Sequence, residues 1–279
     1  MNVTEISLRM ESPMNAVAMP PLPRRAAVAR EQFRAVGLSV RREALACTGV
    51  LALVSTVMLW DRMHHHFSSL EVSPGILVPA AFVALLLPMA MWKGEGPGRR
   101  AYHHAMPVDH GAHAVTRTLA GLVWLFAAIG AYIGWLGAMM LVTGGYAADV
   151  QVFRWMAPLA GAVVLYLLGS ALALRAAHPW RWLAGAAVGY AFLDALSPRH
   201  APIPPLSAVD VVLTGKYGLT TVLSGLSPVL HQRAGEIDGR WYSWYSHEPV
   251  ASVWMTAVWL WLAVAVALFV WSAYRQPER

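Results

Sequence analysis

Apolar residues gather in six stretches of the chain, and polar segments separate them. A bilayer core about 30 Å thick needs roughly 20 apolar residues in a helix. Because backbone groups in hydrocarbon must pair within their own segment, each stretch is predicted to be a membrane-spanning helix. The fifth stretch is short and has the weakest pattern. The six predicted spans are Ala44–Trp60, Gly75–Trp92, Thr118–Thr143, Trp155–Leu174, Trp182–Leu196 and Val250–Tyr274.

Residues 24–43, ahead of the first span, separate apolar from basic side chains. Over Arg24–Arg42, placed at 100° per residue, the two kinds fall on opposite sides of a helix. This pattern is typical of a helix that lies in the membrane interface. The alternative is that the arginines only orient the chain in the membrane. The apolar side has Ala29, Phe33, Val36 and Val40, and the basic side has Arg30, Arg34 and Arg41.

The lysines and arginines between the spans predict the orientation of the chain. If the N-terminus is cytoplasmic, the cytoplasmic segments carry 15 of the 21 basic residues and the outer segments carry 6. This excess fits the rule that cytoplasmic loops are rich in Lys and Arg. Residues 1–23 contain four prolines and are predicted to be a disordered cytoplasmic head. Residues 44–274 form the predicted six-helix transmembrane domain, and residues 275–279 its cytoplasmic tail.

The longest outer segment, residues 197–249, contains a moderately apolar part at 206–230. A further span there would place Lys216 near the middle of the membrane, at a cost of about 2.5–3.5 kcal/mol. A helical hairpin that is re-entrant or lies on the surface avoids this cost, and both forms stay open. The aromatic side chains that follow are predicted to anchor the chain at the interface: Trp241, Tyr242, Trp244 and Tyr245.

Two of the predicted spans have faces of small residues. Gly130 and Gly134 share a face of the third span, and Gly185 and Gly189 share a face of the fifth. Such faces let helices approach closely. Because every helical bundle needs such contacts, packing within the subunit is favoured over a seam between two subunits.

The composition agrees with an all-α polytopic membrane protein. Apolar residues make up 57% of the chain and charged residues 13%, which is too little charge to cover a soluble surface. The net charge of +6 is explained by orientation, so no nucleic-acid partner is expected. The single cysteine, Cys47, excludes a disulfide framework and a cysteine zinc cluster. No P-loop motif occurs, so we expect no ATPase activity, catalytic residue, metal or cofactor in this chain.

The predicted cytoplasmic loop 93–117 has three parts. It begins with glycines and a proline, and Arg100–Met106 then forms a mixed polar and aromatic segment. Pro107 ends that segment, because the residue before a proline avoids the helical conformation. Asp109 stands where it would cap the following helix. The pattern predicts a short helix across the cytoplasmic surface, a break, and a capped transmembrane helix.

At this loop the sequence resembles the membrane subunits of type 2 ABC exporters. Their loop commonly has an aromatic residue, then Leu or Met before Pro-Val, then Ser or Asp, and a basic residue ahead of the next span. Here Arg117 is that basic residue, and His110-Gly111 stands where the family often has two arginines. The order of predicted elements also fits: an elbow helix, six spans and a long outer segment. The matching run is Tyr102-His103-His104-Ala105-Met106-Pro107-Val108-Asp109.

The resemblance implies a permease subunit in a bacterial cytoplasmic (inner) membrane, with both termini cytoplasmic. Its implied partners are separate P-loop ATPase subunits that hold ATP and Mg, a second permease subunit in a homo- or heterodimer, and membrane lipid. The loop would be the coupling helix that docks on the ATPase. The residues implied at that interface are Arg100, Tyr102, His103, His104, Met106, Pro107, Val108 and Asp109.

A different class of function also fits the sequence. The chain could be a membrane-embedded enzyme or an assembly factor that works through the outer segment 197–249. A neighbouring P-loop protein would distinguish the exporter from this alternative.

Overall fold

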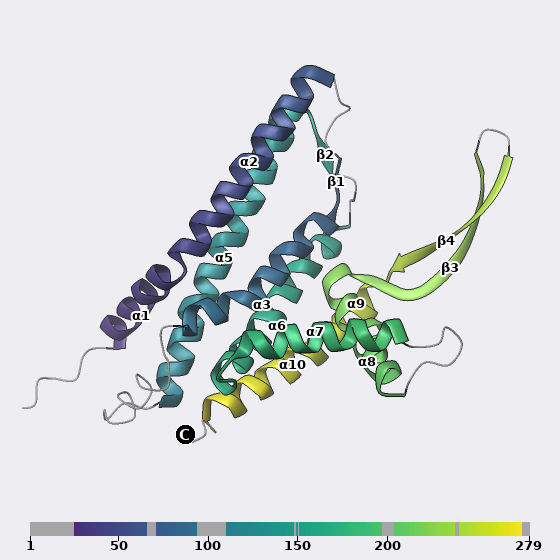
Figure 1. The fold of residues 1–279 in the computed structure, drawn as a ribbon. Coiled ribbons are helices and arrows are strands. Elements are labelled where there is room, and N and C mark those ends of the chain that lie inside the picture. Colours follow the sequence, from purple (N-terminus) through teal and green to yellow (C-terminus); the bar gives the residue numbers. More distant parts are fainter. Residues whose placement is uncertain are drawn as a thin grey trace, which may run out of the picture.

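The chain folds mostly into helices, several of which are long and apolar enough to cross a membrane (Figure 1). The computed structural model describes residues 25–65, 71–93, 110–147, 149, 151–196, 204–237 and 240–274. Five helices in these ranges meet the length and hydropathy of a span, which indicates a membrane-embedded protein, as predicted. The five candidate spans are Arg41–Asp61, Pro74–Trp92, Gly111–Thr143, Val152–Arg175 and Ala251–Tyr274.

The helices and strands follow one another along the chain with short connections. The helices are α1 (Arg25–Ser39), α2 (Arg41–His65), the 3-10 helix η1 (Pro74–Leu77), α3 (Val78–Trp92), α5 (His110–Thr143), α6 (Val152–Arg175), α7 (Pro179–Leu196), α8 (Pro204–Thr214), α9 (Leu219–Ser224) and α10 (Ala251–Tyr274). The strands are β1 (Glu71–Val72), β2 (Tyr146–Ala147), β3 (Leu226–Ile237) and β4 (Arg240–Pro249).

The first four candidate spans alternate in direction. β1 follows α2 and β2 follows α5, and the two strands pair in parallel at one end of the molecule. Helices α2 and α5 run toward this end, whereas α3 and α6 run away from it (Figure 1). α10 runs in the same direction as α6: Phe153 contacts Trp254 near their starts, and Arg175 contacts Trp271 near their ends. This alternation is the one that the predicted topology requires.

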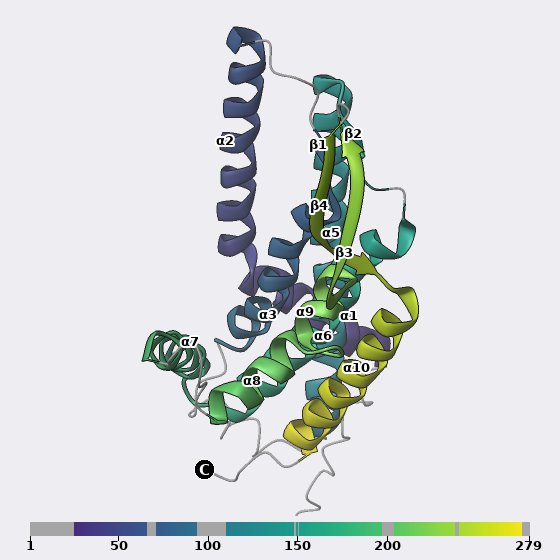
Figure 2. The ribbon, with the colours of Figure 1, turned by 90° about the vertical axis from the view of Figure 1, so that its right-hand side faces the viewer.

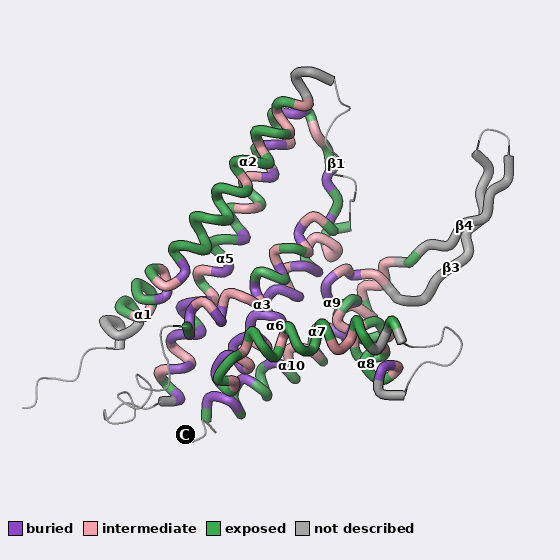
Figure 3. The backbone as a smooth tube through the Cα atoms, viewed as in Figure 1, coloured by how far each residue is buried: buried purple, intermediate pink, exposed green. Residues whose placement is uncertain are grey.

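Helix α6 lies at the centre of the bundle, between α3 and α10. Of its most apolar window, 67% is buried, whereas none of the corresponding window of α2 is buried (Figure 3). Two glycines permit the close packing of α6. A Cβ at Gly169 would clash with the carbonyl oxygen of Leu85, and one at Gly161 would clash with the Leu223 side chain. The core therefore forms around α6, and α2 stands at its edge.

The two predicted glycine faces are open in this structure. A Cβ at Gly130, Gly134, Gly185 or Gly189 would meet nothing within 4 Å. The prediction that these faces pack within the subunit was therefore wrong. The glycines that do pack closely, among them Gly169, lie outside any GxxxG pattern, because close packing depends on which helix lies opposite.

Helix α7 covers the predicted fifth span but is not among the five candidate spans. It has 18 residues, about 27 Å of helix, which is close to the thickness of the hydrocarbon core. Its composition is less apolar than that of the other spans, because Arg181 stands near its start and Asp194 near its end. The sixth transmembrane crossing stays a prediction.

The outer segment contains two short helices followed by a β-hairpin. α8 and α9 lie within the region where the sequence predicts a helical hairpin, and Lys216 between them is exposed. The aromatic run that starts at Trp241 belongs to β4, which pairs antiparallel with β3, and this hairpin was not predicted. Two sequence signals for it exist. Aromatic residues favour strands, and Asp238-Gly239, between the two strands, is a typical hairpin turn pair.

Candidate functional site: the base of the loop between α3 and α5

The residues that the resemblance places at the ATPase interface lie in the segment 94–109, outside the described residues. They are Arg100, Tyr102, His103, His104, Met106, Pro107, Val108 and Asp109. The predicted head 1–23 and tail 275–279 also lie outside. The structure does describe both ends of the loop, where α3 stops at Trp92 and α5 begins at His110. The candidate site is therefore the base on which this loop stands.

Arg117 of α5 joins the two ends of the loop. Its Nη2 donates a hydrogen bond of 2.6 Å to the carbonyl oxygen of Met91, in the last turn of α3. Its guanidinium lies over the ring of Trp92, with Cζ 5.1 Å from the ring centre. The last carbonyls of a helix lack partners within the helix and carry partial negative charge, so a buried cation is favourable here. Arg117 thus fixes the end of α3 to the start of α5.

Tyr166 adds the central helix α6 to this contact. Its hydroxyl donates a hydrogen bond of 2.7 Å to the carbonyl oxygen of Thr118 and lies 3.5 Å from the sulfur of Met91. The ring is fully buried. Gly121 makes room for it, because a Cβ there would clash with both the tyrosine hydroxyl and the methionine side chain. We call the joined side chains the loop-base cluster: Met91, Trp92, Arg117, Thr118 and Tyr166.

Helix α1 packs on the same part of α5. Phe33 stacks on Trp124 with ring centres 5.0 Å apart, and the indole N–H donates a hydrogen bond of 3.1 Å to the Phe33 carbonyl. Gly37 allows this approach, because a Cβ there would lie 2.7 Å from the Trp124 ring. Val36 and Val40, the next members of the predicted apolar stripe, are buried. The stripe is therefore covered by the protein itself.

The basic side of α1 faces away from the bundle. Arg30, Arg34 and Arg41 are all exposed, as the opposite faces of the predicted helix require. The helix itself spans Arg25–Ser39 and leads almost directly into α2. Its position on a membrane surface stays a prediction.

Two further contacts bring α1 and α10 to the start of α5. The Nε2 of Gln32 lies 3.5 Å from the Nδ1 of His113. Gly111 lies against Tyr274, the last residue of α10, so closely that a Cβ would be 2.8 Å from the tyrosine ring. The ends of α3 and α10, the start of α5 and the middle of α1 therefore meet around the base of the loop.

The chemistry of this region suits a mechanical joint. The loop-base cluster holds a guanidinium, a phenol, an indole and a backbone carbonyl in fixed hydrogen bonds. No group of three or more His, Cys, Asp or Glu side chains that could hold a metal ion occurs in the part of the chain that the structure describes. Of the cluster, sequence analysis identified only Arg117, as the basic residue ahead of the span. Trp92 was expected at the membrane interface, whereas it is buried under Arg117.

Comparisons with known proteins add no relative to this picture. No protein-family model matches the chain, and no curated protein and no solved structure is significantly similar to it.

Proposed function

We propose that this chain is the membrane subunit of an ATP-driven exporter of the type 2 ABC class. In this proposal its spans form the translocation pathway together with a second permease subunit. Separate P-loop ATPase subunits, which hold ATP and Mg, dock on the loop between α3 and α5. The support is the loop sequence together with the arrangement of the helices around its base.

The observation that carries the proposal is the contact of Arg117 with the end of α3. A coupling loop must pass a displacement of its ATPase to the spans, and it does so only if its two ends are held firmly. Arg117 and Tyr166 hold α3, α5 and α6 together within one cluster of buried hydrogen bonds. A displacement of the loop would therefore reach the centre of the bundle through α3 and α5 together.

The position of α1 gives a second line of support. An elbow helix precedes the first span in the exporter family, and α1 stands at the corresponding place in this chain. Phe33 and Gly37 join it to Trp124 of α5, within the first turns after the loop. The direction of each of the first four candidate spans also agrees with a cytoplasmic loop between α3 and α5.

One observation favours the alternative function. The β3–β4 hairpin extends away from the helical bundle, so that it is placed to contact another protein (Figure 2). An assembly factor with this hairpin as its working part would need no ATPase partner. The two functions are therefore separated by the partner that the chain binds.

The test is purification of the tagged chain in mild detergent from its own organism. The exporter proposal expects a P-loop ATPase chain to copurify, and expects the chain purified alone to have no ATPase activity. Tyr102→Ala should weaken retention of that ATPase by at least about 1 kcal/mol, roughly fivefold, since an aromatic anchor is typical of interface hot spots. Arg9→Ala, in the predicted head, is the control and should retain the ATPase fully. Absence of any P-loop partner, or ATPase activity in the chain alone, would refute the proposal.

A further inference from the structure

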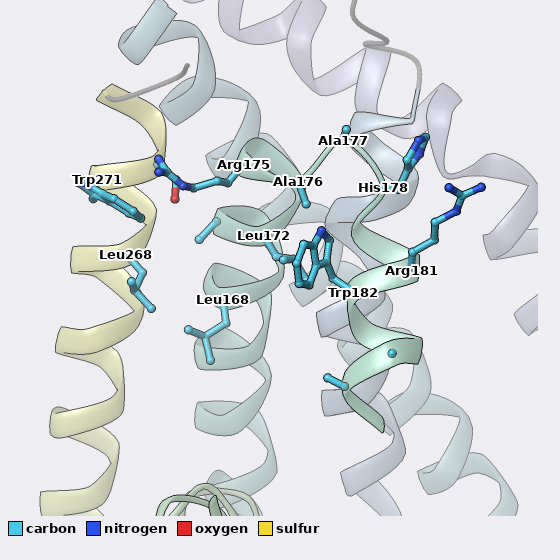
Figure 4. Close-up of a pocket in the computed structure, with 14 residues that line it drawn as sticks. Leu168, Leu172, Arg175, Ala176, Ala177, His178, Arg181, Trp182, Leu268 and Trp271 are labelled. Atoms are coloured by element: carbon cyan, nitrogen blue, oxygen red, sulfur yellow. The ribbon is translucent and has the colours of Figure 1, made fainter. Parts of the chain in front are cut away.

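A wide groove opens between α6, α7 and α10, at the end where α6 and α10 terminate (Figure 4). Its volume is about 1110 Å³. Leu168, Leu172 and Leu268 line its walls, and the connection between α6 and α7 forms its rim. The groove lies apart from the loop-base cluster, and none of its lining residues belongs to that cluster.

The rim of the groove is basic. Arg175, His178 and Arg181 all line it and are all exposed, and none of the lining residues is acidic. Figure 4 shows the three side chains spread along the rim, with Arg175 toward Trp271 and with His178 and Arg181 on the α7 side. The rim therefore offers positive charge on both sides of the groove to a negatively charged group.

Arg175 is held in place by an aromatic contact. Its Cζ lies 3.9 Å from the centre of the Trp271 ring, which is the distance of a close cation–π contact. A guanidinium meets an indole with its face but binds phosphate through N–H groups in its plane. The contact with Trp271 is therefore compatible with phosphate binding and limits the freedom of the arginine side chain.

The depth of the groove matches that of a membrane leaflet near its surface. Arg175 is the last residue of one candidate span, and Trp271 stands three residues before the end of another. The basic rim is thus level with the ends of the spans, where lipid headgroups lie. Leu168 is seven residues, about 10 Å, further along the helix, within the hydrocarbon region. Positive charge at headgroup level above an apolar wall suits a negatively charged molecule with a hydrocarbon tail.

We propose that this groove binds an anionic phospholipid. Its phosphate lies at the rim between Arg175 and Arg181, and an acyl chain lies along Leu168, Leu172 and Leu268. Basic pockets between transmembrane helices on the cytoplasmic side are the places where anionic headgroups bind, and the predicted topology places this rim on that side. The inference depends only on the membrane location of the chain and not on the exporter proposal.

The experiment measures lipid retention by native mass spectrometry of the full chain in detergent. Palmitoyl-oleoyl phosphatidylglycerol and the phosphatidylcholine with the same chains are added at equal concentration, so that only the headgroup charge differs. The proposal expects at least about tenfold better retention of phosphatidylglycerol. R175Q and R181Q should each reduce that retention by about tenfold, the value of one lost hydrogen bond to a charged group. The matched control is R34Q, which removes one exposed arginine from α1 and should retain the lipid as wild type does.

A second variant tests the acyl chain without changing the charge. Gly185 lines the groove, and a Cβ there meets nothing within 4 Å, so Gly185→Phe should fold normally and fill the groove. It should lower retention of phosphatidylglycerol about tenfold while the basic rim stays intact. Inorganic phosphate at millimolar concentration should not displace the lipid. Equal retention of the two lipids, unchanged retention in any of the three groove variants, or displacement by phosphate would each overturn the proposal.

Discussion

At the scale of single residues, Arg117 has the clearest structural role. It is buried, it bonds to the Met91 carbonyl, and it lies on the Trp92 ring. Two of these three features come from residues about 25 positions earlier in the chain. The sequence could show that a basic residue precedes the span, but it could not show which buried carbonyl that residue would reach.

Replacement of Arg117 by methionine tests this role. The variant keeps much of the side-chain volume but removes the hydrogen bond to Met91 and the positive charge at the end of α3. A hydrogen bond from a charged donor contributes about 1.5–3 kcal/mol, so Arg117→Met should lower the free energy of unfolding by this amount. Titration with sodium dodecyl sulfate, followed by helical circular dichroism, measures the loss.

Arg34→Met is the control for this prediction, because Arg34 is exposed on α1. A surface substitution of this kind normally changes stability by less than about 0.5 kcal/mol. Equal stability of the Arg117 and Arg34 variants would mean that the buried contact does not hold α3 and α5 together.

The apolar stripe of α1 shows how far sequence periodicity reaches at this scale. A period of 3.6 residues correctly assigned Val36 and Val40 to the buried side and Arg34 to the exposed side. It could not show what covers the stripe. A membrane surface and the Trp124 face of α5 both cover apolar side chains, and only the tertiary contact distinguishes them.

At the scale of helices and strands, the apolar runs predicted the candidate spans to within a few residues, apart from additions at polar ends. α5 is the largest such addition, since it starts at His110, eight residues before the predicted Thr118. Hydropathy does not report these polar turns, although they remain helical. The β3–β4 hairpin was missed because its aromatic residues fit an interfacial anchor equally well.

The glycines provide the sharpest test of helix packing. Gly169→Ala should destabilise the bundle by about 1–3 kcal/mol, because its methyl group would clash with the Leu85 carbonyl oxygen and α3 would have to move. Gly130→Ala should instead be neutral or add up to about 1 kcal/mol, because it meets open space and alanine favours helix. Thermal unfolding of the two variants in detergent gives the comparison.

The two alanine variants form a matched pair, since each adds one methyl group to a transmembrane helix. A loss of stability in both, or in Gly130→Ala alone, would contradict the packing described for α3 and α6. The pair also tests the open glycine face directly, since a partner helix seated on Gly130 in the assembled protein would make that alanine costly.

At the scale of the whole molecule, the alternating direction of the first spans follows the predicted topology. Both termini are predicted to be cytoplasmic and Lys216 to lie outside. Lys216 is exposed between α8 and α9. A cysteine at position 216 in a Cys47→Ala background should therefore react with an impermeant thiol reagent in intact cells.

A cysteine at position 34, in the same background, is the control for topology. Arg34 is exposed on the predicted cytoplasmic side, so this cysteine should react only after the membrane is permeabilised. Labelling of position 216 only after permeabilisation would invert the predicted orientation of the outer segment.

The loop-base cluster has a mechanical consequence for α2. The cluster and the packing of α6 bind α3, α5, α6 and α10 into one block, whereas no residue in the most apolar window of α2 is buried. One hydrogen bond of 2.7 Å, from the Trp135 indole to the Ser55 hydroxyl, crosses between α5 and α2. A force applied to the loop would therefore move the block as a unit past α2. The plane of slip lies between α2 and α5, where the smallest number of buried side chains has to be displaced.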